Sequence, residues 1–183
     1  SVAYEVYAWD LSVRTAYLDS ERGYFNGTSM FMYVDGFQNV PHFVDIIKPT
    51  GSHFEDWKLA TTLPRVNSVE GMKTWSFGSF VASNYDELVD HPVEMADFDI
   101  IEWDSHGIPH AMVLTGRYVA DLPRLTLDLK IITDYVISFL GKPADLTEYL
   151  FMTMVVGNGY GGLEHRASTS LLCSRKSLPS IGV

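Results

Sequence analysis

One short run of the sequence places ionisable residues directly after glycines. The run reads Gly157-Asn158-Gly159-Tyr160-Gly161-Gly162-Leu163, followed at once by Glu164-His165-Arg166. It lacks the Lys-Ser/Thr ending of a P-loop and the spacing of a dinucleotide fingerprint, so phosphate binding is disfavoured. Glycines let a ligand's backbone approach closely, and a carboxylate beside them binds a cation such as a peptide's amino terminus. The run indicates either a flexible hairpin loop or a ligand-binding strand that ends in Glu164.

The three ionisable residues at the end of this run also have a purely structural interpretation. On a strand, Glu164 and Arg166 face one side and His165 faces the other. A surface ion pair between Glu164 and Arg166 contributes only ~0–1 kcal/mol to stability. Such a pair implies no activity, and both readings stay open at the level of spacing.

Histidine spacing gives no metal site within the chain. His106 and His110 are four residues apart, but they fall in a predicted hairpin rather than a helix, and the zinc-protease pattern H-E-x-x-H is absent. The lone cysteine, Cys173, has apolar neighbours, which favours a core position over a nucleophile. The remaining isolated histidines in predicted loops are His42, His53 and His91.

An acidic stretch in the middle of the chain lacks the register of a calcium loop. We expect these carboxylates to form a solvated face. They are Asp86, Glu87, Asp90, Glu94, Asp97, Asp99, Glu102 and Asp104.

Composition excludes several classes of partner. The formal net charge of −10 argues against a general nucleic-acid binder, which needs basic groups to displace phosphate counterions. One cysteine excludes an internal disulfide framework. No apolar run approaches the ~18 residues of a membrane helix, and no signal peptide is visible. The compartment stays open between cytoplasm and periplasm.

The first part of the chain, residues 1–115, is expected to be mainly antiparallel β-structure, because short apolar stretches alternate with Gly, Pro and Asn turn signals. A four-residue loop at 104–107 is expected to close a hairpin, and 85–90 one helical turn. The expected strands are residues 2–9, 13–18, 28–34, 44–47, 57–62, 98–103 and 108–115.

Beyond Gly116 the apolar residues recur at helical spacing, which predicts a helix over 123–140 with one buried stripe. Asp121 is expected to cap its start, and Gly141 to end it. The stripe consists of Leu122, Leu125, Leu129, Ile132, Val136 and Phe139. A buried strand is expected at 149–156, and residues 167–173 are expected to form either a last strand or the start of a helix. The fold class is therefore α+β, with a boundary near residue 116.

The motif Gly161-Gly162-Leu163-Glu164-His165-Arg166, followed by Ser168-Thr169, resembles a signature of the glycyl aminopeptidase family of zinc metallopeptidases, whose members often carry a PDZ domain. Other segments agree in order along nearly the entire chain. They include Tyr4-Glu5-Val6-Tyr7-Ala8, Asp10-Leu11-Ser12-Val13-Arg14, Phe25-Asn26-Gly27-Thr28-Ser29, Tyr85-Asp86-Glu87-Leu88-Val89-Asp90 and Gly107-Ile108-Pro109-His110.

The resemblance implies that this chain is an internal fragment of a longer zinc aminopeptidase. Residues 1–115 would hold the later strands of its N-terminal β-domain, and 116–183 the opening of a thermolysin-like catalytic domain that stops before the H-E-x-x-H helix. Zinc would be the cofactor of the longer enzyme, with both histidine ligands, the catalytic base and the third ligand beyond Val183. The fragment would hold no catalytic residue and would be inactive alone.

The resemblance also assigns roles in substrate binding. Gly161 and Gly162 would lie along the peptide backbone, Glu164 would hold the substrate's amino terminus, and His165 and Arg166 would support it. The expected partners are a peptide substrate and the remainder of the catalytic domain, with dimerisation through an exposed strand edge as a further expectation. The rival from another class is a stand-alone, non-catalytic β-rich module that binds peptide or carbohydrate.

Overall fold

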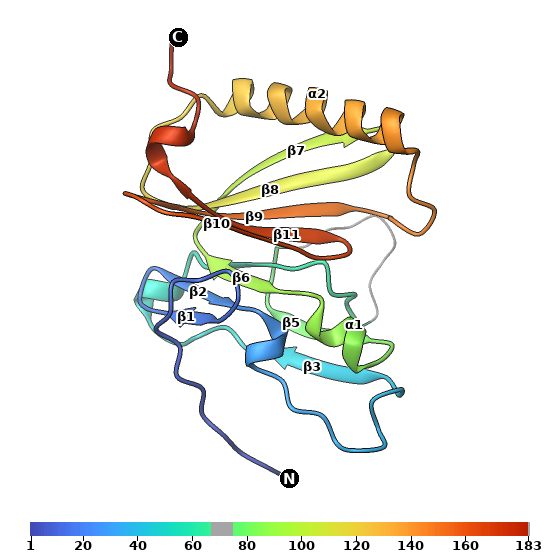
Figure 1. Ribbon diagram of the computed structural model, residues 1–183. Coiled ribbons are helices and arrows are strands. Elements are labelled where there is room, and N and C mark those ends of the chain that lie inside the picture. The colour runs from blue at the N-terminus through green and yellow to red at the C-terminus, as the bar shows by residue number, and fades with distance from the viewer. Residues whose placement is uncertain (67–74, 183) are drawn as a thin grey trace. The chain divides into compact units, whose positions relative to one another are not determined.

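A computed structural model describes residues 1–66 and 75–182, so part of the predicted β-structure, residues 67–74, lies outside the described residues. The chain forms two compact units, Ser1–Asp97 and Phe98–Val183 (Figure 1). This division lies before the boundary expected near residue 116. The spacing of apolar residues changes near residue 116 because a helix begins there. The strand that ends at Gly116, however, pairs with a strand that follows the helix, so it lies in the second unit.

The first unit is β-rich, as expected. Its main sheet is antiparallel and has four strands in the order β1-β2-β6-β4, and β3 pairs with β5 in a separate antiparallel ribbon. The short helix α1 (Tyr85–Val89) starts at Asn84, whose side chain accepts a hydrogen bond from the Glu87 backbone N–H. The strands are β1 (Ala16–Leu18), β2 (Arg22–Phe25), β3 (His42–Ile46), β4 (Lys58–Ala60), β5 (Gly78–Ala82) and β6 (Val93–Ala96).

A buried ion pair joins the two central strands of this sheet. Arg22 donates from Nε and Nη2 to the two carboxylate oxygens of Glu94, at 2.7 Å each, and the Glu94 side chain is fully buried. The expectation of a solvated acidic face is therefore wrong for Glu94. Its carboxylate is buried because a bidentate guanidinium offsets the cost of removing it from water.

Two strands expected in the first unit are absent from the described residues. Residues 1–8 contain no strand, and Trp9 forms only a single bridge, to Tyr17. Residues 28–34 were expected to be a strand, but Gly27–Ser29 is a 3₁₀ turn capped by the Asn26 side chain, which accepts from the Thr28 N–H. Side-chain capping gives the backbone an alternative to sheet pairing that alternation of apolar residues does not reveal.

The second unit contains a five-stranded mixed sheet in the order β10-β11-β9-β8-β7 (Figure 1). Strand β9 is parallel to both of its neighbours, β8 and β11, while the two outer pairs are antiparallel. The long helix α2 connects β8 to β9, as a parallel connection requires. The elements are β7 (Asp99–Ser105), β8 (Ile108–Gly116), α2 (Leu122–Leu140), β9 (Tyr149–Val156), β10 (Tyr160–Glu164) and β11 (Ser168–Ser174).

The β7–β8 hairpin is tighter than expected. Its loop consists of His106 and Gly107, which both have positive φ, 55° and 74°. Two consecutive residues of this kind match the twist of the flanking strands. The Asp104 carboxylate accepts from the Gly107 N–H at 3.0 Å, so the strand pairing continues through Ser105 and Ile108.

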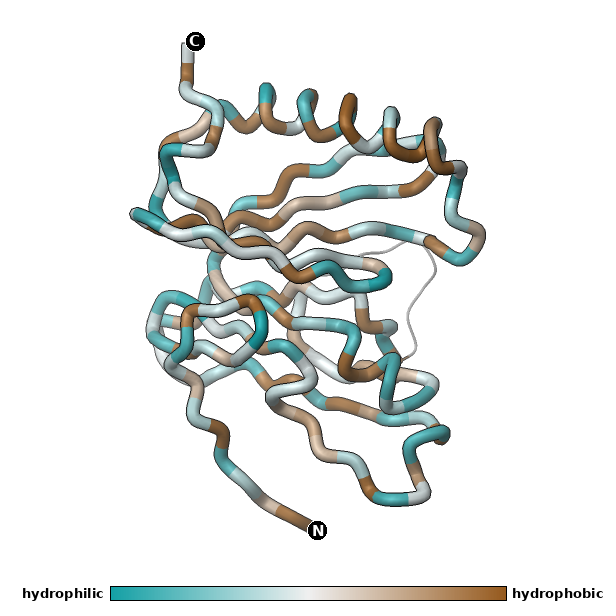
Figure 2. The backbone as a smooth tube through the Cα atoms, viewed as in Figure 1, coloured by the Kyte–Doolittle hydropathy of each residue, from teal (hydrophilic) through white to brown (hydrophobic). Residues whose placement is uncertain are grey.

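Helix α2 has the predicted ends but not the predicted burial. Asp121 accepts a hydrogen bond from the Arg124 N–H, and Gly141 ends the helix with φ 89°. Leu122, Leu125 and Leu129 pack against the core over the sheet. The later members of the stripe are exposed. Figure 2 shows hydrophobic residues recurring along the whole length of α2. Large exposed residues of α2 are Leu127, Ile131, Ile132, Tyr135, Val136, Phe139 and Leu140.

No helix among the described residues has the length and hydrophobicity that a membrane span needs.

Candidate functional site

Strand β10 carries the predicted glycines and Glu164, and it lies at an edge of the five-stranded sheet. Within residues 1–66 and 75–182 it pairs only with β11, from Tyr160–Cys173 to Glu164–Thr169. Its outer backbone N–H and C=O groups can therefore pair with a further extended chain. This is the geometry through which sheets bind peptides.

The register places Glu164 and Gly162 on the face of the sheet that α2 covers. Residues paired across neighbouring strands point to the same face. The helix packs against Ile101 and Trp103 of β7, which fixes this face. Gly161 lies on the opposite face. The row that ends in Glu164 is Ile101, Met112, Phe151, Thr169 and Glu164, and the row that ends in Gly162 is Asp99, Leu114, Thr153, Leu171 and Gly162.

The Glu164 carboxylate extends back over Gly162. A Cβ built at Gly162 would lie 3.7 Å from Oε1 of Glu164 and 3.6 Å from a methyl carbon of Leu171, both ordinary contact distances. Gly162 therefore has room for a methyl group, and its φ does not require glycine. The fold of this chain does not explain the glycine, but a ligand that occupies this space would.

Strand β10 ends at Glu164, so the other two ionisable residues lie in the turn to β11. The expectation that Glu164 and Arg166 share a strand face is therefore wrong. Arg166 is exposed, and His165 is half-buried and donates its backbone N–H to the Ser168 carbonyl at 2.8 Å.

Tyr149, the first residue of β9, was missed by sequence reasoning. Its hydroxyl donates to the same Ser168 carbonyl oxygen at 3.2 Å. Burial raises the pKa of its phenol, and the negative charge of Glu164 raises it further. In the sequence, Tyr149 is the first residue of an apolar stretch and nothing marks it as functional. Only the parallel pairing of β9 with β11 brings it close to the turn that follows Glu164.

Aromatic rings extend from Tyr149 towards α2. The His110 ring lies 6.0 Å from the Tyr149 ring and stacks on Trp103 at 5.5 Å, and Phe151 meets Tyr149 edge-on at 5.1 Å. Nδ1 of His110 lies 2.8 Å from the Ile108 carbonyl oxygen. Burial lowers the pKa of His110, which favours the neutral ring.

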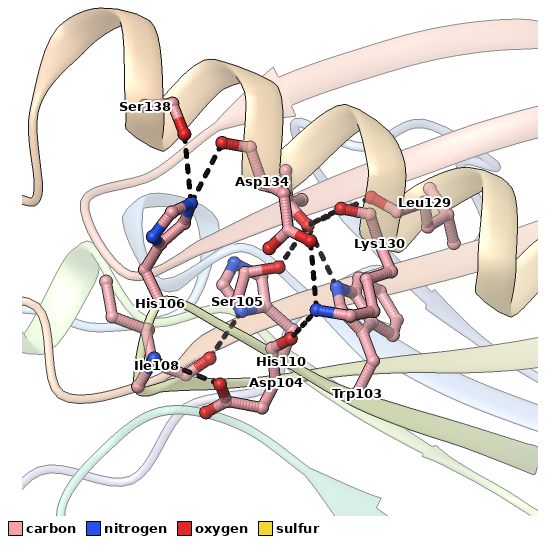
Figure 3. A network of polar contacts seen from close by, with 12 residues as sticks. Trp103, Asp104, Ser105, His106, Ile108, His110, Leu129, Lys130, Asp134 and Ser138 are labelled. Atoms are coloured by element: carbon pink, nitrogen blue, oxygen red, sulfur yellow. Dashed lines mark hydrogen bonds and ion pairs between the residues drawn. The ribbon is translucent and has the colours of Figure 1, made fainter.

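A polar network fixes α2 to the β7–β8 hairpin at the same end of the sheet (Figure 3). Thr133 lies at its centre: it accepts from Nε1 of Trp103 at 3.0 Å and its oxygen lies 2.6 Å from Oγ of Ser105. His106 uses Nε2 towards the Asp134 carbonyl and the Ser138 hydroxyl. His106 therefore has hydrogen-bond partners on the helix, which favours a structural role for this residue.

The described residues do not form a metal site. Within residues 1–66 and 75–182, no group of three or more His, Cys, Asp or Glu side chains is placed to hold a metal ion. The His106 and His110 rings contact different partners. The His106 ring contacts the backbone of α2, and the His110 ring contacts the backbone of its own strand. The described side chains therefore offer no ligand set that fits a zinc ion.

The Peptidase M61 N-terminal domain family matches residues 1–97. The chain belongs to the M61 peptidase family. The matched region coincides with the first compact unit, Ser1–Asp97, so the β-rich unit is the M61 N-terminal domain. The resemblance drawn from sequence motifs is confirmed at the level of this peptidase family.

A solved structure agrees with this assignment over both units. The crystal structure of an aminopeptidase N family protein from Idiomarina loihiensis is 47% identical to this chain, with a TM-score of 0.89 over 97% of it. The chain covers 29% of that structure's chain. No curated protein matches the chain.

Proposed function

We propose that this chain is the substrate-binding part of a zinc aminopeptidase of the glycyl aminopeptidase type, in which β10 binds the peptide and Glu164 binds its amino terminus. The observation that carries the proposal is the position of Glu164. Its carboxylate lies over an unexplained glycine on an edge strand, whose outer side pairs with no other strand among the described residues. The M61 membership and the similarity to an aminopeptidase N family protein support a peptidase rather than a carbohydrate-binding module.

The arrangement suits the recognition of a free amino terminus. A peptide that adds to β10 as a further strand gains main-chain hydrogen bonds. An aminopeptidase must also distinguish a terminal ammonium from an internal amide. A fixed carboxylate at the end of the strand makes this distinction, because it forms a charge-assisted hydrogen bond only with the ammonium.

The catalytic metal belongs to another part of the enzyme in this proposal. The 183-residue chain lacks H-E-x-x-H, and its described residues form no metal cluster. When bound in the whole enzyme, zinc would polarise the scissile carbonyl and activate water. The residues of this chain would only align the peptide and fix its amino terminus, so we expect the chain alone to be inactive.

The second unit is proposed to be the opening of a thermolysin-like catalytic domain. The apolar outer side of α2 supports this, because contiguous exposed apolar surface marks contact with further protein. The remainder of the catalytic domain is the proposed occupant, and dimerisation through the β10 edge would compete with substrate.

The proposal is tested by Glu164→Gln in the whole enzyme. Removing the charge at constant shape should cost ~1.5–3 kcal/mol of transition-state binding. This corresponds to a roughly 10- to 150-fold loss in kcat/KM on a peptide with a free amino terminus. The matched control is Glu102→Gln, an exposed carboxylate on β7 at the other edge of the same sheet. Equal activity of the two variants would contradict the proposal.

A further inference from the structure

We propose that Tyr149 is a positioning residue for Glu164: its hydroxyl braces the β10–β11 turn and so fixes the carboxylate over the strand edge. The inference rests on the proposed function of Glu164. It assigns a role to a residue of β9 that is two strands away from β10 in the sheet.

The first step is the shared acceptor. The Ser168 carbonyl oxygen accepts from the Tyr149 hydroxyl at 3.2 Å and from the His165 N–H at 2.8 Å. The second of these bonds closes the turn directly after Glu164. Tyr149 therefore connects β9 to the backbone that sets the direction of the Glu164 side chain.

The second step is the rigidity of Tyr149 itself. Its ring contacts that of Phe151 at 5.1 Å and that of His110 at 6.0 Å, and His110 in turn stacks on Trp103. Trp103 is tied to α2 through Thr133. Aromatic packing of this kind leaves the phenol few alternative positions, so the hydroxyl acts as a fixed point at the turn.

The third step is the opposite side of the turn. Thr169, which pairs with Glu164, donates its hydroxyl to the Leu163 carbonyl at 3.3 Å. Side chains from β9 and β11 thus hold the backbone on both sides of Glu164. The Glu164 side chain itself is exposed, so its orientation depends on this backbone support more than on its own packing.

The electrostatics keep Tyr149 in its donor form. Burial and the nearby Glu164 carboxylate both raise the pKa of the phenol. A tyrosine is already protonated at neutral pH, and the raised pKa extends to higher pH the range in which the Tyr149 hydroxyl can donate to Ser168.

The test is a double-mutant cycle in the whole enzyme, with Tyr149→Phe in the native and in the Glu164→Gln background. A lost neutral hydrogen bond predicts a roughly 3- to 10-fold loss in kcat/KM on a free-amine peptide, mainly through KM, in the native background. In the Glu164→Gln background the same change should alter kcat/KM less than about twofold, because the group that Tyr149 positions is already inactive. Tyr7→Phe removes an exposed hydroxyl in the first unit and is the control.

A second readout does not depend on catalysis. Amide exchange at His165, measured in the same variants, should be faster in Tyr149→Phe and unchanged in Tyr7→Phe. Equal losses of kcat/KM in both backgrounds, or unchanged exchange at His165, would overturn the role of Tyr149 while Glu164 keeps its own. If Glu164→Gln alone had no effect on free-amine substrates, the proposed function would fall instead.

Discussion

At the scale of single residues, two glycines of the same sheet differ in whether the fold requires glycine. Gly116 has φ 103°, and a Cβ there would lie 2.3 Å from the Val155 carbonyl oxygen, whereas Gly162 has ordinary space around it. The fold therefore requires glycine at position 116 and does not require it at 162. A glycine without a structural requirement supports a role in binding.

Alanine substitutions at these positions should separate stability from activity. Gly116→Ala is expected to lower the free energy of unfolding by at least ~1–3 kcal/mol, because of backbone strain. Gly162→Ala should leave it unchanged or raise it by up to ~1 kcal/mol, since glycine weakens a strand interior. The whole enzyme with Gly162→Ala should nevertheless cleave peptides more slowly. Chemical denaturation and kcat/KM provide the two measurements, and full activity of Gly162→Ala would argue against a substrate on β10.

The buried ion pair of the first unit gives a second prediction. Glu94→Gln removes the charge opposite Arg22 and leaves a buried guanidinium without compensation. The expected loss is ~3–5 kcal/mol in the free energy of unfolding. Urea denaturation of the Ser1–Asp97 unit within the chain measures it, with the exposed Glu102→Gln as control. A loss below ~1 kcal/mol would show that this pair behaves like a surface one.

At the scale of elements, α2 carries apolar residues on two sides. The side with Leu125 and Leu129 packs on the sheet, and the side with Tyr135 and Phe139, whose rings stack at 6.3 Å, is exposed. Changing Tyr135 and Phe139 together to Gln should alter the stability of this chain by less than about 0.5 kcal/mol per site and reduce self-association.

In the whole enzyme the same double change should be destabilising, if the remainder of the catalytic domain covers this side of α2. Changing Leu125 and Leu129 to Gln is the matched control and should destabilise both proteins. Thermal unfolding with sedimentation velocity distinguishes the cases. Equal tolerance of the Tyr135 and Phe139 changes in both proteins would contradict the proposed occupant.

Sequence patterns predicted some elements well for physical reasons. Helix α2 was predictable because its cap, period and terminal glycine all indicate the same element. The β7–β8 strands were predictable because a loop signal that ends in glycine separates two β-rich stretches. The expected strand at 28–34 was wrong, because the Asn26 cap, a local side-chain interaction, overrode the alternation. The exposed side of α2 could not be predicted, since periodicity gives which residues are apolar and not what covers them.

At the scale of the whole molecule, the candidate site depends on pairing between distant segments. The Gly-Gly-Leu-Glu run could be located from the sequence, whereas the edge position of β10 is known only from the order of strands in the sheet. The contribution of Tyr149 could not be predicted, because β11 inserts between β9 and β10 only in the folded sheet. The M61 family assignment concerns residues 1–97, so the function proposed for the second unit rests on the geometry of β10 and on the similarity to the aminopeptidase N family structure.

The central claim is that Glu164 recognises a free amino terminus. The most direct measurement compares kcat/KM for a peptide with a free amino terminus and for its N-acetylated form, in the native whole enzyme and in Glu164→Gln. The account predicts that the variant loses roughly 10- to 150-fold on the free peptide, as expected for a charged hydrogen bond, and little on the acetylated one. An equal loss on both peptides, or no loss on either, would contradict it.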